Sequence, residues 1–180
     1  MLARGMQTNG KQFDLLPAAT NMTQLAWSCQ LELEAIKALE NVCNTANPSR
    51  PNSGGKASIY VDKFQGVVSA EIFFAQNLRE ILSKVDTFVG FQFTRSGSVK
   101  INPIYRAEKG IKDYANVAWA ATKNVGCSIV KCTTDDRYVS VCRYTPSGNI
   151  VGESIYKIGP YCSSNPGTTQ SCDKNTGLWP

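Results

Sequence analysis

The chain has 180 residues, of which 42% are hydrophobic and 18% are charged, as is typical of one globular domain. The net charge of +5 is small and the basic residues are scattered, which argues against a nucleic-acid-binding protein. No apolar run approaches the roughly 20 residues that a membrane span requires. The chain has no histidine, which excludes Ser-His, Cys-His and His-ligated metal mechanisms.

The N-terminal part of the chain predicts a helix end and one amphipathic helix. Residues 1–6 have the pattern of a helix that stops near Gly5. Residues 30–43 repeat apolar side chains at helical spacing, and the Asn-, Pro-, Ser- and Gly-rich segment 44–55 ends this helix. Its apolar face consists of Leu31, Ala35, Ala38, Leu39 and Val42.

A short strand and a second amphipathic helix are predicted next. Ser58–Asp62 consists largely of residue types that favour strands. Residues 69–85 repeat apolar residues at helical spacing, and this stripe is expected to face the core. The stripe consists of Phe74, Leu78, Ile81, Leu82 and Val85.

The second half of the chain predicts a third helix, a β-hairpin and an irregular tail. Lys112–Thr122 has a short helical pattern around its tryptophan. Cys127–Lys131 and Arg137–Tyr144 read as two strands joined by a polar turn. The turn contains Asp135-Asp136, for which a turn role is favoured over catalysis. The tail, residues 162–180, is rich in Ser, Gly, Pro and Asn and lacks periodicity.

Seven cysteines leave two alternatives, a disulfide framework in an oxidising compartment or a zinc site in a reducing one. Cys127 and Cys132 have loose metal-ligand spacing, but they lie five positions apart on the predicted strand 126–132 and point to opposite faces of it. This favours disulfides over zinc. The odd count leaves one thiol unpaired, and the first residues lack the pattern of a signal peptide. We therefore expect a mature or truncated chain whose missing cysteine lies upstream.

Two stretches of the second half carry unusual patterns. Val139–Ile150 reads VSVCRYTPSGNI, and its Cys-x-Tyr-x-Pro-x-Gly-Asn pattern is long and specific. Asp113–Trp119 reads DYANVAW. The two resemble the second and first signatures of the CAP superfamily (cysteine-rich secretory, antigen five and pathogenesis-related proteins), with departures at Ser140 and at the histidine usual in the position of Asp113. Leu16–Glu32 and the tail are similar to hookworm-type activation-associated secreted proteins, including the branch of platelet and neutrophil inhibitors.

The resemblance implies an α+β fold in which helices pack on both faces of a small antiparallel sheet, a disulfide-stabilised α-β-α sandwich. It implies a CAP domain over residues 1–158 and a cysteine-containing C-terminal tail over 159–180, in a protein secreted to the extracellular space. By similarity the disulfides are Cys43–Cys132, Cys127–Cys142 and Cys162–Cys172, and Cys29 is left unpaired in this chain.

Many CAP proteins have a cleft in which two histidines and two glutamates hold a divalent metal. By similarity one histidine position is Asp113, the glutamate positions are Ala57 and Asn77, and the second histidine would precede Met1. A carboxylate, an amide and a methyl group do not complete the coordination shell of zinc. We therefore expect a degenerate site with no metal, no cofactor and no catalytic residue.

The resemblance favours a secreted, non-enzymatic binding protein of a parasitic nematode that modulates host cells by inhibiting platelet or leukocyte adhesion, with an integrin as the suspected partner. The candidate interaction residues are aromatic and arginine side chains of the irregular segment 88–110: Phe88, Phe91, Phe93, Arg95, Tyr105 and Arg106. The alternative is a carrier of a sterol or fatty acid, with an apolar groove lined by residues 72–82 and 88–93. Asn21-Met22-Thr23 is a sequon for glycosylation at Asn21.

Overall fold

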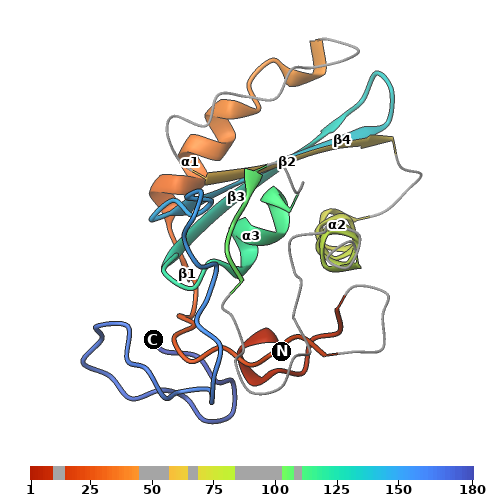
Figure 1. The fold of residues 1–180 in the computed structure, drawn as a ribbon. Coiled ribbons are helices and arrows are strands. Elements are labelled where there is room, and N and C mark those ends of the chain that lie inside the picture. Colours follow the sequence, from red (N-terminus) through yellow and green to blue (C-terminus); the bar gives the residue numbers. More distant parts are fainter. Residues whose placement is uncertain (10–14, 45–56, 65–68, 84–102, 108–110) are drawn as a thin grey trace.

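The computed structural model describes residues 1–9, 15–44, 57–64, 69–83, 103–107 and 111–180, and its centre is a four-stranded sheet (Figure 1). The strands lie in the order β1-β3-β4-β2. Their bounds are β1 (Ala26–Trp27), β2 (Ala57–Phe64), β3 (Asn124–Cys132) and β4 (Arg137–Thr145). Within the described ranges, no helix is both long enough and apolar enough to cross a membrane.

The predicted antiparallel sheet is present, and a short parallel strand is added at one edge. β2, β3 and β4 pair in antiparallel fashion, whereas β1 pairs in parallel with β3. The backbone N–H groups of Ala26 and Ser28 donate to the carbonyls of Lys123 and Val125 on that edge. β1 leads into α1 and runs in the same direction as β3.

β3 and β4 form the predicted hairpin, and each strand is longer than expected. The predicted turn is confirmed, with Asp136 at a φ of 55°, a left-handed conformation that aspartate tolerates. Arg137 opens β4 and is buried. Its Nε lies 3.5 Å from the Asp135 carboxylate, and its Nη2 donates to the Val42 carbonyl at 3.5 Å. This arginine therefore anchors the end of the hairpin to the segment that follows the first helix.

α1 (Cys29–Ala38) begins at a serine cap. The Ser28 Oγ accepts a hydrogen bond from the backbone N–H of Leu31 at 3.3 Å. The predicted apolar face is confirmed, because four of its five members are buried and Ala38 is half-buried. The helix ends earlier than predicted: Asn41 adopts a left-handed φ of 63°, and the chain continues as the 3₁₀ helix η2 (Val42–Asn44).

α1 and η2 cover one face of the sheet. Leu39 and Val42 pack there with Val139 and Val141 of β4 in one apolar cluster. A disulfide between Cys43 and Cys132 joins η2 to the end of β3. This face is therefore held both by apolar burial and by a covalent bond.

α2 (Ala70–Ser83) and α3 (Lys112–Ala118) lie on the opposite side of the sheet from α1 (Figure 1). Tyr144 of β4 packs on this side against Ile81 of α2 and Val117 of α3. A second disulfide, Cys127–Cys142, joins positions that face each other on β3 and β4. Helices thus cover both faces, and the predicted α-β-α sandwich is confirmed.

The buried stripe of α2 differs from the predicted one. Phe73 is buried and stacks on Tyr138 with ring centroids 5.2 Å apart, and Asn77 is buried one turn later. Leu78, which was expected in the core, is 43% exposed. Two members of the predicted stripe fall outside the side chains that the structure describes: Phe74 and Val85. Ile81 and Leu82 of the predicted stripe are partly buried and pack against the core, and Phe73 is buried although it is not part of that stripe.

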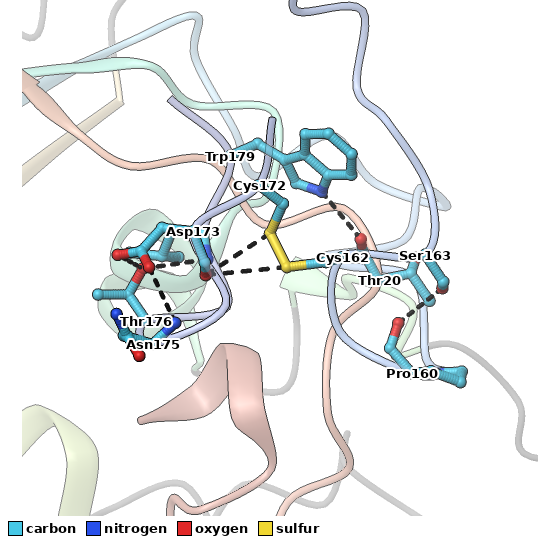
Figure 2. Close-up of a disulfide and its surroundings, with 10 residues drawn as sticks. Thr20, Pro160, Cys162, Ser163, Cys172, Asp173, Asn175, Thr176 and Trp179 are labelled. Carbon is cyan, nitrogen blue, oxygen red and sulfur yellow. Dashed lines mark hydrogen bonds between the residues drawn. A yellow bond between two sulfur atoms is a disulfide. The ribbon is translucent and has the colours of Figure 1, made fainter. Parts of the chain in front are cut away.

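The two ends of the chain meet at one end of the molecule (Figure 1). The predicted helix end is the 3₁₀ helix η1 (Leu2–Arg4), which stops at Gly5 with a left-handed φ of 68°. In the tail, a disulfide joins Cys162 to Cys172 (Figure 2). Beside it, hydrogen bonds from the Asn175 backbone N–H and the Thr176 hydroxyl lower the pKa of Asp173. The division at residue 158 stays a prediction.

Candidate functional site

The three positions expected from the family cleft converge around Tyr144 of β4. Ala57, the first residue of β2, is paired in register with Tyr144. Asn77 lies on α2, one helical turn before the Ile81 that contacts the tyrosine. Asp113 lies in the first turn of α3, one turn before Val117, the other contact. One strand and two helices that adjoin Tyr144 therefore carry the three positions, which together with Tyr144 we call the cleft.

The electrostatics of this cleft favour neutral groups. Burial, and to a smaller extent the Asp113 carboxylate, raise the pKa of Tyr144, so the phenol stays protonated at neutral pH. Asn77 is buried, and its Nδ2 finds no hydrogen-bond partner in the described part of the chain. The cleft thus combines a neutral phenol, an amide donor and a single half-buried carboxylate.

This donor set does not fit the divalent metal of the family. Zinc sites in proteins use four ligands drawn from thiolate, imidazole and carboxylate groups, and harder cations require more oxygens. Asp113 supplies one carboxylate, Asn77 one amide oxygen and Ala57 nothing. Among the residues that the structure describes, no three His, Cys, Asp or Glu side chains gather in a group that could hold a metal ion.

The most specific sequence motif has a structural role beside the cleft. The Asn149 Nδ2 donates to the Asn116 side chain and to the Lys112 carbonyl of α3. A Cβ placed on Gly148 would lie 2.6 Å from the Trp119 ring, so only glycine permits this close packing. The motif therefore joins the end of β4 to α3 and fixes the position of Asp113 relative to Tyr144.

The structure corrects one of the predicted interaction residues. Tyr105 is only 4% exposed and packs edge-to-face on Trp119, with ring centroids 6.2 Å apart. It belongs to the core because residues 103–105 are hydrogen-bonded to the loop after β4. Arg106 is exposed. The other four candidates lie outside the described residues: Phe88, Phe91, Phe93 and Arg95.

Sequence reasoning missed an exposed aliphatic pair beside Arg106. The Gly152 N–H donates to the Tyr105 carbonyl at 3.1 Å, and the Tyr105 N–H donates to the Glu153 carbonyl at 2.8 Å. These bonds place the turn that carries Ile150 and Val151 next to Arg106, and both aliphatic side chains are exposed, Val151 by 66%. We call Arg106, Ile150 and Val151 the turn patch. Two adjacent aliphatic residues before Gly152 were its sequence signal.

The residues suggested for a lipid groove divide between core and surface. Ile72 and Leu78 of α2 are exposed, whereas Phe73 is buried against Tyr138. Residues 88–93, the other expected wall, lie outside the described residues. The lipid-carrier hypothesis stays a prediction.

The remaining candidate residues lie outside the cleft. Cys29 is exposed in the first turn of α1 and forms no disulfide within the described part of the protein. Asn21 is half-exposed, and its Oδ1 accepts a hydrogen bond from the Lys157 backbone N–H at 3.1 Å.

Comparison with known proteins places these observations in a family. The chain is 29% identical to the Ancylostoma secreted protein of Ancylostoma caninum over 98% of its own length, but it spans 40% of that protein. It is also 29% identical to cysteine-rich venom protein VAR8 of Varanus acanthurus, covering 87% of this chain and 73% of that protein. These relatives include secreted and venom proteins.

Solved structures show the same fold. The structure entitled NaASP2 with Zn2+ aligns with a TM-score of 0.73 at 23% identity, over 98% of this chain and 86% of that one. Hookworm Platelet Inhibitor aligns with a TM-score of 0.62 at 20% identity, over 89% of this chain and 76% of that one. Residues 3–144 match the family described as CAP: Cysteine-rich secretory protein family. The chain therefore belongs to the CAP family of cysteine-rich secretory proteins.

Proposed function

We propose that this chain is a secreted, extracellular and non-enzymatic binding protein that a parasitic nematode releases to modulate host cells. Inhibition of platelet or leukocyte adhesion, with an integrin as receptor, is the activity we assign to it. The relatives called Ancylostoma secreted protein and Hookworm Platelet Inhibitor support this assignment. The disulfides support an oxidising compartment.

The observation that carries the proposal is the chemistry of the cleft. Hydrolysis requires an activated nucleophile, a paired acid and base, or a metal-bound water. Ala57 and Asn77 supply neither an acid nor a base, and Tyr144 stays protonated because its pKa is raised. Asp113 is the single carboxyl group among these positions. Because these residues lack the groups that hydrolysis requires, we assign the protein a binding role that its surface performs.

The turn patch is the surface we assign to the host receptor. Protein interfaces derive much of their affinity from a few exposed side chains, among which arginine is enriched. Arg106 offers a cation beside two exposed aliphatic side chains, Ile150 and Val151, which are held by backbone hydrogen bonds to the same segment. A receptor site with an acidic rim around an apolar pocket fits this arrangement.

Adhesion of purified platelets and neutrophils to immobilised fibrinogen tests the function. We expect the disulfide-bonded protein to reduce adhesion in a dose-dependent manner, and the double variant Arg106→Glu/Val151→Asp to be at least about tenfold less potent, a loss typical of interface hot spots. The control for Val151→Asp is Leu33→Asp, which places the same single charge on an exposed aliphatic position of α1.

Two outcomes contradict different parts of the proposal. If the unaltered protein leaves adhesion of both cell types unchanged, the adhesion function is wrong. If it reduces adhesion but the double variant and Leu33→Asp are equally potent, the function stands and the turn patch is not the receptor-binding surface.

A further inference from the structure

The sequon Asn21-Met22-Thr23 lies in the described segment that joins the N-terminal region to β1. The Asn21 side chain is oriented by its Oδ1, which accepts the Lys157 backbone N–H at 3.1 Å. Its Nδ2 makes no hydrogen bond with any residue that the structure describes, and the residue is half-exposed. The atom to which a sugar would be attached is therefore the one that the fold leaves available.

We propose that Asn21 carries an N-linked oligosaccharide, a modification that rests on the proposed secretory route. In the transfer, the Asn21 Nδ2 attacks the anomeric carbon of a lipid-diphosphate-linked oligosaccharide. The new N–C bond replaces the anomeric C–O bond, the lipid diphosphate leaves, and the proton lost from Nδ2 passes to a base of the transferase. In the folded protein the sugar extends from Nδ2 while Oδ1 keeps its bond to Lys157.

The folded structure also fixes when the transfer takes place. The acceptor sequence requires the threonine hydroxyl. In the fold, Thr23 is buried. Its hydroxyl donates toward two backbone carbonyls, that of Ala120 at 2.7 Å and that of Thr122 at 2.8 Å. The hydroxyl is thus engaged inside the protein and is not accessible to an enzyme.

The C-terminal tail closes over the same segment. The Trp179 backbone N–H donates to the Met22 carbonyl at 2.9 Å, and its carbonyl accepts the Gln24 N–H at 2.7 Å. The indole Nε1 of Trp179 donates to the Thr20 carbonyl at 3.2 Å (Figure 2). Both neighbours of the sequon are therefore bound by Trp179, which lies far downstream in the sequence. The oligosaccharide is attached before this residue docks.

Secretion of the 180-residue chain from insect cells behind a signal sequence tests the attachment, with intact mass measured before and after treatment with an N-glycosidase. We expect the unaltered chain and Thr23→Ser, which keeps the sequon and the hydroxyl, to be heavier by one oligosaccharide that the enzyme removes. Asn21→Asp keeps an oxygen for the Lys157 N–H and should lack the added mass. Equal masses for the unaltered chain and Asn21→Asp overturn the proposal, whatever the adhesion assay shows.

The timing has its own test. Bacterially produced, refolded protein and a reduced, denatured sample are each incubated with microsomal transferase and its lipid-linked donor. We expect glycosylation of the denatured sample only. Equal glycosylation of both samples would show that the fold does not protect the sequon and would overturn the assigned order of events.

Discussion

At the scale of single residues, Gly126 decides how closely α1 can approach the sheet. A Cβ at this position would lie 2.3 Å from the backbone nitrogen of Glu32 and 2.6 Å from the backbone carbon of Leu31, atoms that cannot move without the helix. We predict that Gly126→Ala lowers the free energy of unfolding by about 1–3 kcal/mol, the cost of overpacking a core. Urea denaturation measures the change. Ser128→Ala, also on β3, is the control and should unfold near the midpoint of the unaltered protein.

The cleft gives a second prediction at this scale. Zinc that saturates a native site at 100 times its dissociation constant raises stability by about 2.7 kcal/mol. Because Asp113 is the sole carboxylate among the three cleft positions, we expect an excess of zinc chloride to leave the thermal midpoint unchanged, as followed by scanning fluorimetry. A saturable rise that Asp113→Asn abolishes would show that the cleft holds zinc.

The resemblance to the family named the three cleft positions, which stay a prediction, and it did not indicate which residue lies beside them. The motif around Asp113 gave its place directly. Tyr144 lies within the other motif, yet its central place depends on the contacts of β4 with α2 and α3, which no local pattern contains. Tyr105 is predicted to be exposed because it is an aromatic residue of an irregular segment, whereas its burial depends on contact with the distant Trp119.

At the scale of elements, regular periodicity was predictable and short-range geometry was not. The hairpin and the apolar face of α1 follow from spacing in the sequence and are confirmed. β1 has two residues, too few to produce a pattern, and it is defined by the edge of β3. In α2, Ile81 and Leu82 of the predicted stripe pack on the core, whereas the burial of Phe73 depends on its stack with the distant Tyr138, which no local pattern shows.

The disulfides differ in what they should contribute to stability. Cys43 and Cys132 are 89 residues apart, so loss of their disulfide should lower the free energy of unfolding by about 4–5 kcal/mol in the chain-entropy description. Cys162 and Cys172 are 10 residues apart, for which the same description gives about 3 kcal/mol. We predict that Cys43→Ala/Cys132→Ala lowers the midpoint of chemical unfolding more than Cys162→Ala/Cys172→Ala. The reverse order would show that native-state contacts of the tail outweigh loop length.

At the scale of the whole molecule, two regions are each stabilised by their own interactions: α1 with η2 on the sheet, and the two ends of the sequence. α1 and η2 are held to the sheet by apolar packing and one disulfide, whereas the two ends of the sequence are held to each other by backbone hydrogen bonds and by a second apolar cluster that includes Ala19, Met22 and Tyr156. Changes in the tail should therefore leave the sheet folded, since none of its strands includes a tail residue.

Trp179 tests this separation. Trp179→Ala removes a buried ring and the indole hydrogen bond to the Thr20 carbonyl, so we predict local opening of the tail. The amide of Gln24, which donates to the Trp179 carbonyl, should exchange its hydrogen faster, while the amide of Val141 in β4 keeps its rate. Tyr161→Ala removes an exposed tail ring and is the control, with no expected change at Gln24. Equal acceleration at Gln24 and Val141 would instead mean that tail and sheet unfold as one cooperative unit, because a local opening cannot release an amide in the central strands.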